Sequence, residues 1–107
     1  MNATKDLHIE PCGADTYLVG RCMDKYHNWN ESRLRLDDCL GDDGGRFEWG
    51  GKEFTDRAQN IRFNPDEGAS HVPVLRAQLQ DDQGKFLDTD VNLAERINNQ
   101  DGSLLFN

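Results

Sequence analysis

The residues best suited to binding chemistry in this chain are four consecutive polar side chains: Asn98, Asn99, Gln100 and Asp101. Amide and carboxylate groups held on a rigid turn supply hydrogen-bond donors and acceptors in pairs, as the neighbouring hydroxyls of an uncharged ligand require. Asp24 and Asp101 would make the strongest of these bonds because they are charged, and Tyr26 would add a flat apolar contact. A glycine follows the segment, so a plain hairpin turn explains the same residues.

Catalytic and metal-binding patterns are weak by comparison. The three histidines lack the spacing of a metal site or a catalytic triad, and no GxSxG motif or glycine-rich phosphate loop occurs. Twenty acidic residues make carboxylate pairs easy to find, so such pairs do not indicate a glycosidase. An EF-hand loop begun at Asp38 would place Leu40 at its third position, which argues against calcium. We therefore expect no enzyme activity, no metal and no cofactor.

The overall charge limits the classes of partner. A net charge of −8 and a pI near 4.7 would repel nucleic acid and anionic membranes, but they do not penalise a neutral ligand. No apolar run reaches the length of a signal peptide or a membrane span. We expect a cytoplasmic protein, or one secreted by an unconventional route.

The elements that must hold the polar turn come from an internal repeat. Sliding residues 17–49 forward by 57 positions, without a gap, places Leu18 on Leu75 and matches eight apolar positions with apolar positions. The other seven pairs are Cys22/Leu79, Trp29/Phe86, Leu34/Val91, Leu36/Leu93, Leu40/Ile97, Phe47/Leu104 and Trp49/Phe106. Each half of about fifty residues is too small to bury a core alone. We therefore expect one domain, 1–107, whose repeats, approximately 1–50 and 51–107, share a core.

Local patterns predict mostly strands and turns. Alternating apolar residues predict a strand at 74–80 and its repeat mate, followed by a turn at 81–84 and a return strand from 86 to 93. Apolar residues four apart predict single helical turns at 36–40 and 93–97, before glycine turns and the short strands 46–49 and 103–106. Phe54, Ala58 and Ile61 share a helical face, which predicts a helix before a short strand at 61–63.

Two further expectations concern spacing and burial. Residues 6–9 match 60–63 at an offset of 54, which implies three extra residues in the loop 65–73. We expect Trp29, Trp49, Phe47 and Phe86 in the core because their repeat partners are also apolar. The three cysteines form no CxxC motif, so we expect reduced thiols, with Cys22 buried and Cys39 partly exposed.

A tandem unit of strand, turn, strand, helical turn, glycine hairpin and aromatic strand resembles the cyanovirin-N homology (CVNH) family. The segments that carry the resemblance are 34–49 (LRLDDCLGDDGGRFEW) and 91–106 (VNLAERINNQDGSLLF), and Phe54 and Asn60 also fall at family positions. The resemblance implies an all-β, pseudo-twofold fold of two lobes, each a three-stranded sheet plus a β-hairpin with short helical turns, with strands exchanged between the repeats. It also implies a non-catalytic, metal-free lectin that binds mannose-rich glycans or mannobiose units.

The same resemblance implies one sugar pocket in each lobe. The first, which we favour, would contain Asn2, Ala3, Met23, Asp24, Lys25, Tyr26, Asn98, Asn99, Gln100 and Asp101. The second would contain Gly41, Asp42, Asp43, Gly44, Lys52, Glu53, Asp56, Gln80, Asp81, Asp82 and Gln83. Acidic and basic residues replace small polar ones of the family pattern in the second set, so we expect at least one pocket to be altered or inactive.

The chain departs from the family archetype in its cysteines. Each archetypal repeat carries a cystine, whereas here Cys22 faces Thr4, and Ala58 and Leu79 replace the second pair. We therefore expect a disulfide-free fold that rests on core packing. The flexible joint at 49–52 leaves a monomer as the expected state and a domain-swapped dimer as the alternative. The alternative function is a protein-interaction module that kept the fold and lost sugar binding.

Overall fold

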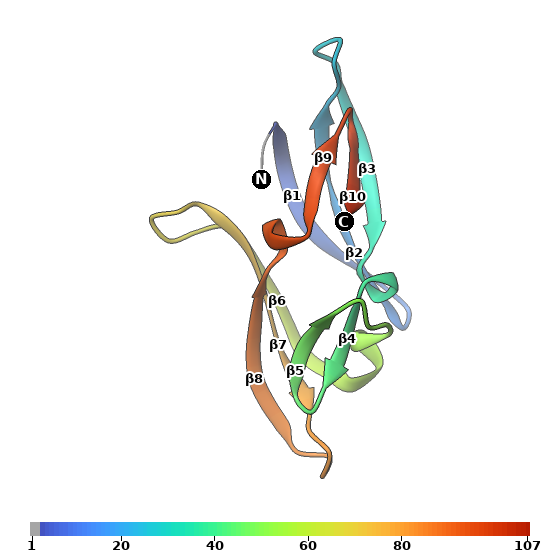
Figure 1. The fold of residues 1–107 in the computed structure, drawn as a ribbon, viewed down its shortest axis with the longest axis vertical. Helices are drawn as coiled ribbons and strands as arrows, with labels where there is room; N and C mark the ends of the chain where they lie inside the picture. Colours follow the sequence, from blue (N-terminus) through green and yellow to red (C-terminus); the bar gives the residue numbers. More distant parts are fainter. Residues whose placement is uncertain (1–2) are drawn as a thin grey trace.

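A computed structural model describes residues 3–107, and within them the chain forms four small antiparallel sheets (Figure 1). One three-stranded sheet has the order β1-β2-β3, and the other has the order β6-β7-β8. The strands of these two sheets are β1 (Thr4–Cys12), β2 (Asp15–Met23), β3 (Trp29–Arg35), β6 (Ala58–Glu67), β7 (Val72–Gln80) and β8 (Phe86–Asn92). Two hairpins complete the fold: β4 (Leu40–Asp43) with β5 (Arg46–Trp49), and β9 (Ile97–Gln100) with β10 (Ser103–Phe106). Three short 3₁₀ turns link them: η1 (Leu36–Asp38), η2 (Phe54–Arg57) and η3 (Leu93–Glu95).

Each hairpin packs on the sheet of the other repeat. Figure 1 shows the late hairpin β9–β10 beside the early strand β3, and the early hairpin β4–β5 beside the late strand β8. The backbone N–H of Leu104 in β10 donates to the Ser32 hydroxyl in β3 at 3.0 Å. The first lobe is therefore β1-β2-β3 with β9–β10, and the second lobe is β6-β7-β8 with β4–β5. The strand exchange between repeats is confirmed.

The repeat is visible in the core of this elongated molecule, which measures 50 × 30 × 21 Å. Leu18 and Leu75 are both fully buried, and one apolar cluster takes residues from both halves. Trp49 stacks on Phe106, its own repeat partner, with ring centroids 5.7 Å apart. A contact between two equivalent residues places the approximate twofold axis between them. The all-β, pseudo-twofold architecture is confirmed.

The match of residues 6–9 with residues 60–63 is also visible in the two sheets. The β1–β2 ladder shifts register between Lys5 and His8, and the β6–β7 ladder shifts between Gln59 and Arg62. Asp6 and Asn60 sit at these two irregularities with left-handed φ angles of 56° and 54°. The same bulge thus recurs at equivalent places in the two repeats.

The predicted helix from Phe54 to Ile61 is wrong beyond Arg57. The helical turn η2 ends there, and Ala58 already pairs with Leu79 in the β6–β7 ladder. The bulge at Asn60 adds one residue to the strand, so inward-facing positions are spaced by three residues instead of two. That spacing imitates one turn of a helix. Strand β6 is also much longer than the three residues predicted.

Three burial predictions need correction. Trp29 and Phe86 lie at equivalent ends of β3 and β8 and are 39% and 36% exposed, so neither is a core anchor. The ammonium group of Lys5 lies over the Trp29 ring, with Nζ 4.2 Å from the ring centroid. Cys39 is buried rather than partly exposed, and burial raises the pKa of its thiol to about 11. Cys22 is buried as predicted, and all three cysteines are free.

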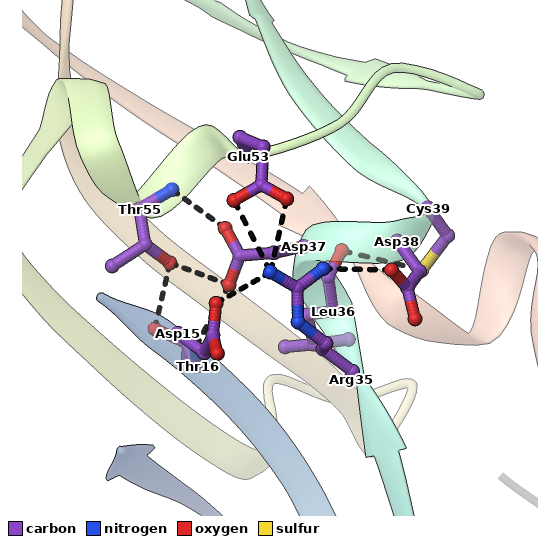
Figure 2. Close-up of polar contacts among 9 residues, drawn as sticks. All are labelled: Asp15, Thr16, Arg35, Leu36, Asp37, Asp38, Cys39, Glu53 and Thr55. Atoms are coloured by element: carbon purple, nitrogen blue, oxygen red, sulfur yellow. Dashed lines mark hydrogen bonds and ion pairs between the residues drawn. The ribbon is translucent and has the colours of Figure 1, made fainter. Parts of the chain in front are cut away.

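A polar cluster joins the two repeats at the turn η1 (Figure 2). The carboxylate of Asp37 is fully buried and accepts hydrogen bonds from the backbone N–H groups of Thr16 and Thr55, both at 2.8 Å, and from the Thr55 hydroxyl. Beside it, Arg35 donates to Asp15, Asp38 and Glu53. Because Thr55 and Glu53 follow the joint between the repeats, this cluster fixes how the second half leaves the first. Among residues 3–107, no helix is long and apolar enough to cross a membrane.

Candidate functional site

A cavity of about 440 Å³ opens where the β9–β10 turn, the β2–β3 turn and the start of β1 meet. Its lining consists of Ala3, Met23, Asp24, Lys25, Asn99 and Asp101. All six belong to the first pocket predicted from the sequence. Residues separated by almost the whole length of the chain are therefore brought to one place by the exchanged hairpin.

Asn99 ties the three walls of this cavity together. Its side-chain Nδ2 donates to the carbonyl oxygens of Ala3 and Met23, at 3.1 and 3.0 Å, and its Oδ1 accepts from the backbone N–H of Gly102 at 2.9 Å. Both amide hydrogens are thus used within the protein. Asn99 positions the cavity walls, and its amide has no donor left for a ligand.

Asp24 and Asp101 shape the β2–β3 turn from two sides. Asp24 accepts hydrogen bonds from the backbone N–H groups of Tyr26 and Asn28 and from the side chain of Asn30. These bonds, led by that from Asn30, hold the pKa of Asp24 below its usual value. Asp101 Oδ1 accepts from the backbone N–H of Lys25 at 2.8 Å. A carboxylate offers about four acceptor positions, so Asp101 keeps capacity for other donors.

The corresponding region of the second lobe contains different side chains at the positions of Asn99 and Ala3. Asp42 occupies the repeat position of Asn99, and Arg57 occupies that of Ala3 at the offset of 54. Arg57 Nε donates to Asp42 Oδ2 at 3.0 Å, and the Asp42 side chain is only 1% exposed. Asp42 Oδ1 accepts from the backbone N–H of Gly45 at 2.8 Å, as Asn99 does from Gly102.

The remaining second-pocket residues are partly engaged elsewhere. The Glu53 carboxylate accepts from Arg35 in the polar cluster of Figure 2. Asp81 caps its own turn through the backbone N–H groups of Gln83 and Lys85, as Asp24 does in the first lobe. Gly41 touches the backbone at Lys52 so closely that a Cβ atom there would lie 2.8 Å from its nitrogen. The predicted acidic residues Asp43, Asp56 and Asp82 are exposed.

Comparison with known proteins agrees with this architecture. The sequence matches the family model of the CVNH domain over residues 2–105. The chain belongs to the CVNH family. A cyanovirin-N homolog of Neurospora crassa is 43% identical over 98 residues, which cover 92% of this chain and 88% of the relative. A designed cyanovirin-N homolog lectin, LKAMG, superimposes with a TM-score of 0.89 at 42% identity, over 99% of this chain and 96% of that one.

Two more distant CVNH structures contain saccharides. A microvirin:mannobiose complex superimposes with a TM-score of 0.82 at 24% identity, over 98% of this chain and 94% of the other. A MoCVNH3 variant in complex with (N-GlcNAc)4 has a TM-score of 0.79 at 20% identity, over 98% and 94%. At these identities the likeness to the present chain is one of fold.

Several residues predicted for the first CVNH pocket do not line the cavity. Asn98 and Gln100 bond to each other, with Gln100 Nε2 also donating to Asn107. Tyr26 is 72% exposed, with the Lys25 ammonium 5.3 Å from its ring centroid. Asn2 lies outside the described residues. Strand alternation explains Asn98 and Gln100, because they point away from the face that carries Asn99.

The sequence interpretation also missed residues that support the two pockets. Asn30 holds Asp24 and would lie 2.8 Å from a Cβ atom at Gly102, so it packs under the first CVNH pocket. Arg57 follows the predicted second-pocket segment by one residue. The available signal was the repeat itself, since Leu87 stands opposite Asn30 and Ala3 opposite Arg57. A difference between equivalent positions marks where two similar lobes cannot behave alike.

A larger hollow of about 710 Å³ lies between β5 and β8, and none of the residues predicted for either pocket lines it. Phe47, Trp49, Leu87 and Val91 contribute apolar surface to it, and Trp49 Nε1 lies 3.5 Å from Glu95. It is open along the edges of two strands and lacks the converging short hydrogen bonds of the first-lobe cavity. Within residues 3–107, no group of three or more His, Cys, Asp or Glu side chains is placed to hold a metal ion.

Proposed function

We propose that this CVNH protein is a non-catalytic lectin that binds mannose-containing oligosaccharides in the cavity of the first lobe. The observation that carries the proposal is the convergence of Asn99 and Asp101 with the β2–β3 turn around about 440 Å³. The exchanged hairpin is tied to β1 and β2 by the Asn99 side chain, so the cavity exists before a ligand arrives. Such preorganisation lowers the entropy cost of binding.

The chemistry of the lining suits neighbouring hydroxyl groups. Asp101 offers charged acceptor positions, Lys25 offers an ammonium donor, and Asp24 fixes the backbone between them. Two carboxylates at the cavity disfavour an anionic ligand, whereas a neutral saccharide meets no such penalty. A shallow, water-exposed pocket of this kind binds weakly, with a dissociation constant of roughly micromolar to millimolar.

The choice of mannose rests on the family. CVNH structures have been solved with mannobiose and with an N-acetylglucosamine oligomer, so saccharides are the ligand class that related proteins support. Between these two we propose the mannose disaccharide, because a small, shallow cavity lined by six residues contacts a short ligand more completely than a long chain. Direct comparison of the two ligands tests this choice.

The test is an NMR titration of the ¹⁵N-labelled protein with α-mannobiose and, separately, with the N-acetylglucosamine tetramer. We expect mannobiose to shift amide signals at residues 23–26 and 98–101, and the tetramer to shift them less at equal concentration. The Asp43→Ala variant is a matched control, since it removes an exposed carboxylate from the hairpin of the other lobe. Silence toward both saccharides would contradict the proposal and favour the protein-interaction module. Release of free mannose would contradict the non-catalytic assignment.

A further inference from the structure

Five of the six residues that line the first-lobe cavity are replaced at the equivalent positions of the second lobe, and three of these replacements change the bonds and space of the pocket. The hairpin of the first lobe carries Asn99 and Asp101, whereas the hairpin of the second carries Asp42 and Gly44 at the equivalent positions. At the start of the neighbouring long strand, Ala3 is replaced by Arg57. The other two replacements, Met23 by Gln80 and Lys25 by Asp82, lie at the ends of β2 and β7 and in the turns that follow. Asp24 and Asp81 cap these turns with the same pattern of backbone bonds.

The exchange of Asn99 for Asp42 changes what the hairpin can bond. Asn99 donates two hydrogen bonds to the backbone carbonyls of Ala3, just before β1, and of Met23, at the end of β2, which holds the hairpin against both walls of the first-lobe cavity. A carboxylate has no hydrogen to donate and cannot make these bonds. Asp42 instead accepts from Arg57 Nε at 3.0 Å. In the second lobe, the Arg57–Asp42 ion pair therefore joins the hairpin β4–β5 to the residue that precedes β6.

The ion pair also changes the space available. The carboxylate of Asp42 is 1% exposed, so it is withdrawn from any ligand, while the Arg57 side chain is 50% exposed. Ala3, at the equivalent place, lines the first-lobe cavity with only a methyl group. Arg57 places a far larger, half-exposed side chain at that position, bonded to Asp42 of the hairpin. Its charge is already balanced by Asp42, so it does not attract an anion in compensation.

The third difference removes an acceptor. Asp101 and Gly44 share a left-handed backbone, with φ of 49° and 60°, so the turn geometry is the same. Only Asp101 supplies a carboxylate to the cavity and to the backbone N–H of Lys25. A Cβ atom at Gly44 would meet nothing within 4 Å, so the absence of a side chain there is not forced by packing.

We propose that Arg57, Asp42 and Gly44 close the second lobe to the saccharide that the first lobe binds, so this chain is a one-site lectin whose lobe selectivity is set by these three positions. The inference rests on the proposed function of the first lobe. It assigns a specificity-determining role to Arg57, a residue outside the segments that the sequence predicted for either pocket.

The test restores three of the five differing first-lobe residues in the second lobe with the triple variant Asp42→Asn, Gly44→Asp and Arg57→Ala. Titrated with α-mannobiose and followed by NMR, the wild type is expected to shift amides of the first lobe only. The variant is expected to show a second set of shifts at 41–45 and 80–83, with second-lobe affinity at least about tenfold higher than in the wild type. Arg46→Ala is the matched control, because it removes an exposed cation from the same hairpin without touching the ion pair.

The outcomes separate this inference from the proposed function. If the wild type binds in the first lobe and the variant gains no second set, the inference is wrong and the lectin function stands. Second-lobe binding by the wild type also overturns the inference. If the wild type binds nowhere, the proposed function fails, and a gain of binding in the variant alone would still support the role of the three positions. Absence of binding in both proteins overturns both.

A measurement without sugar guards against a variant that fails to fold. The Arg57 Nε–H group is bonded to a buried carboxylate, so its hydrogen should exchange with water more slowly than that of the exposed Arg46. Asp42→Asn should remove this protection. Equal exchange rates for the two arginines in the wild type would contradict the ion pair on which the inference depends.

Discussion

Asn99 and Asp101 stand two residues apart in one turn and have different roles. Asn99 spends both amide hydrogens on the backbone of β1 and β2, whereas Asp101 uses one carboxylate oxygen on Lys25 and keeps acceptor capacity. Asp101→Asn retains a side chain that tolerates the left-handed backbone and removes the charge. We expect α-mannobiose affinity to fall by about tenfold, as for loss of a charge-assisted bond, with the melting temperature nearly unchanged. Isothermal titration calorimetry measures the affinity. In the same experiment, the control variant Asp43→Asn should bind like the wild type.

Asn99→Ala, in contrast, should lower the stability of the protein as well as its sugar affinity. Removal of the amide takes these bonds from the Met23 carbonyl and the Gly102 N–H, while the Ala3 carbonyl keeps its bond from the Met23 N–H, so we expect a loss of about 1–3 kcal/mol in the free energy of unfolding. Urea denaturation measures this loss. Sugar binding should weaken as well, because the hairpin is no longer tied to the other two walls. A variant as stable as the wild type would place Asn99 among the ligand-binding groups instead.

The stability of the β2–β3 turn should depend on pH through the carboxyl group of Asp24. Its pKa is lowered on folding, first by the Asn30 side chain, so its contribution to the turn is complete above its ordinary pKa of 3.8 and is lost as pH falls through the lower folded value. We therefore expect the turn to stay intact from neutral pH down to about pH 4. Asn30→Ala should raise the Asp24 pKa toward 3.8, as followed by NMR of its carboxyl carbon. An unchanged pKa in that variant would contradict the assigned cause.

The sequence predicted residue types at the site better than residue roles. Asn99, Asp101, Asp24 and Lys25 were expected in one pocket, and the structure brings them together. The role of Asn99 could not be predicted, since it depends on two carbonyl oxygens that only the exchanged hairpin reaches. Tyr26 was expected to cover the ligand and is largely exposed, because an aromatic residue at a turn tip carries no pattern that fixes its direction.

At the scale of elements, the turn η1 is the most constrained part of the fold. Asp37 receives three hydrogen bonds there from Thr16 and Thr55, while its repeat partner is Ala94, so the cluster exists in one repeat only (Figure 2). It joins the end of the first repeat to the start of the second. This asymmetry shows that two homologous units can share a fold and still need a unique connection.

Asp37→Ala should therefore destabilise the protein strongly. The change leaves buried donors of Thr16 and Thr55 unpaired and opens a small void, for which we expect about 2–4 kcal/mol of lost unfolding free energy. Asp38→Ala is the matched control in the same turn, because its carboxylate is exposed and bonded to Arg35. That change should cost less than about 1 kcal/mol. Similar midpoints for both variants in urea would contradict the role given to Asp37.

The internal repeat allowed most of the element order to be predicted. Strands β5 and β10 and the turns η1 and η3 follow apolar spacings that occur twice, and a pattern seen twice is hard to mistake. The failure at Phe54–Ile61 has a physical origin in the bulge at Asn60, which gives a strand the spacing of a helix. The first repeat contained the correction, since Asp6 occupies the equivalent bulge in a segment that no helix pattern suggested.

At the scale of the whole molecule, the shape determines what one active lobe can do. The protein extends 50 Å along its longest axis, and the two exchanged hairpins lie in opposite lobes (Figure 1). With pockets in both lobes the monomer could bridge two glycans, and binding would gain from effective concentration. With one pocket it binds each glycan singly, however many mannose units that glycan presents.

We therefore expect the monomeric fraction, isolated by size exclusion, to bind a mannose-rich glycoprotein without precipitating it. The triple variant Asp42→Asn, Gly44→Asp, Arg57→Ala should precipitate the same glycoprotein, because a second pocket makes the monomer bivalent. Adding Asp101→Asn to the triple variant should abolish precipitation again, since it weakens the first pocket while the second stays open. Light scattering over a range of protein-to-glycoprotein ratios measures all three. Precipitation by the wild-type monomer would require a second active site and would contradict closure of the second lobe.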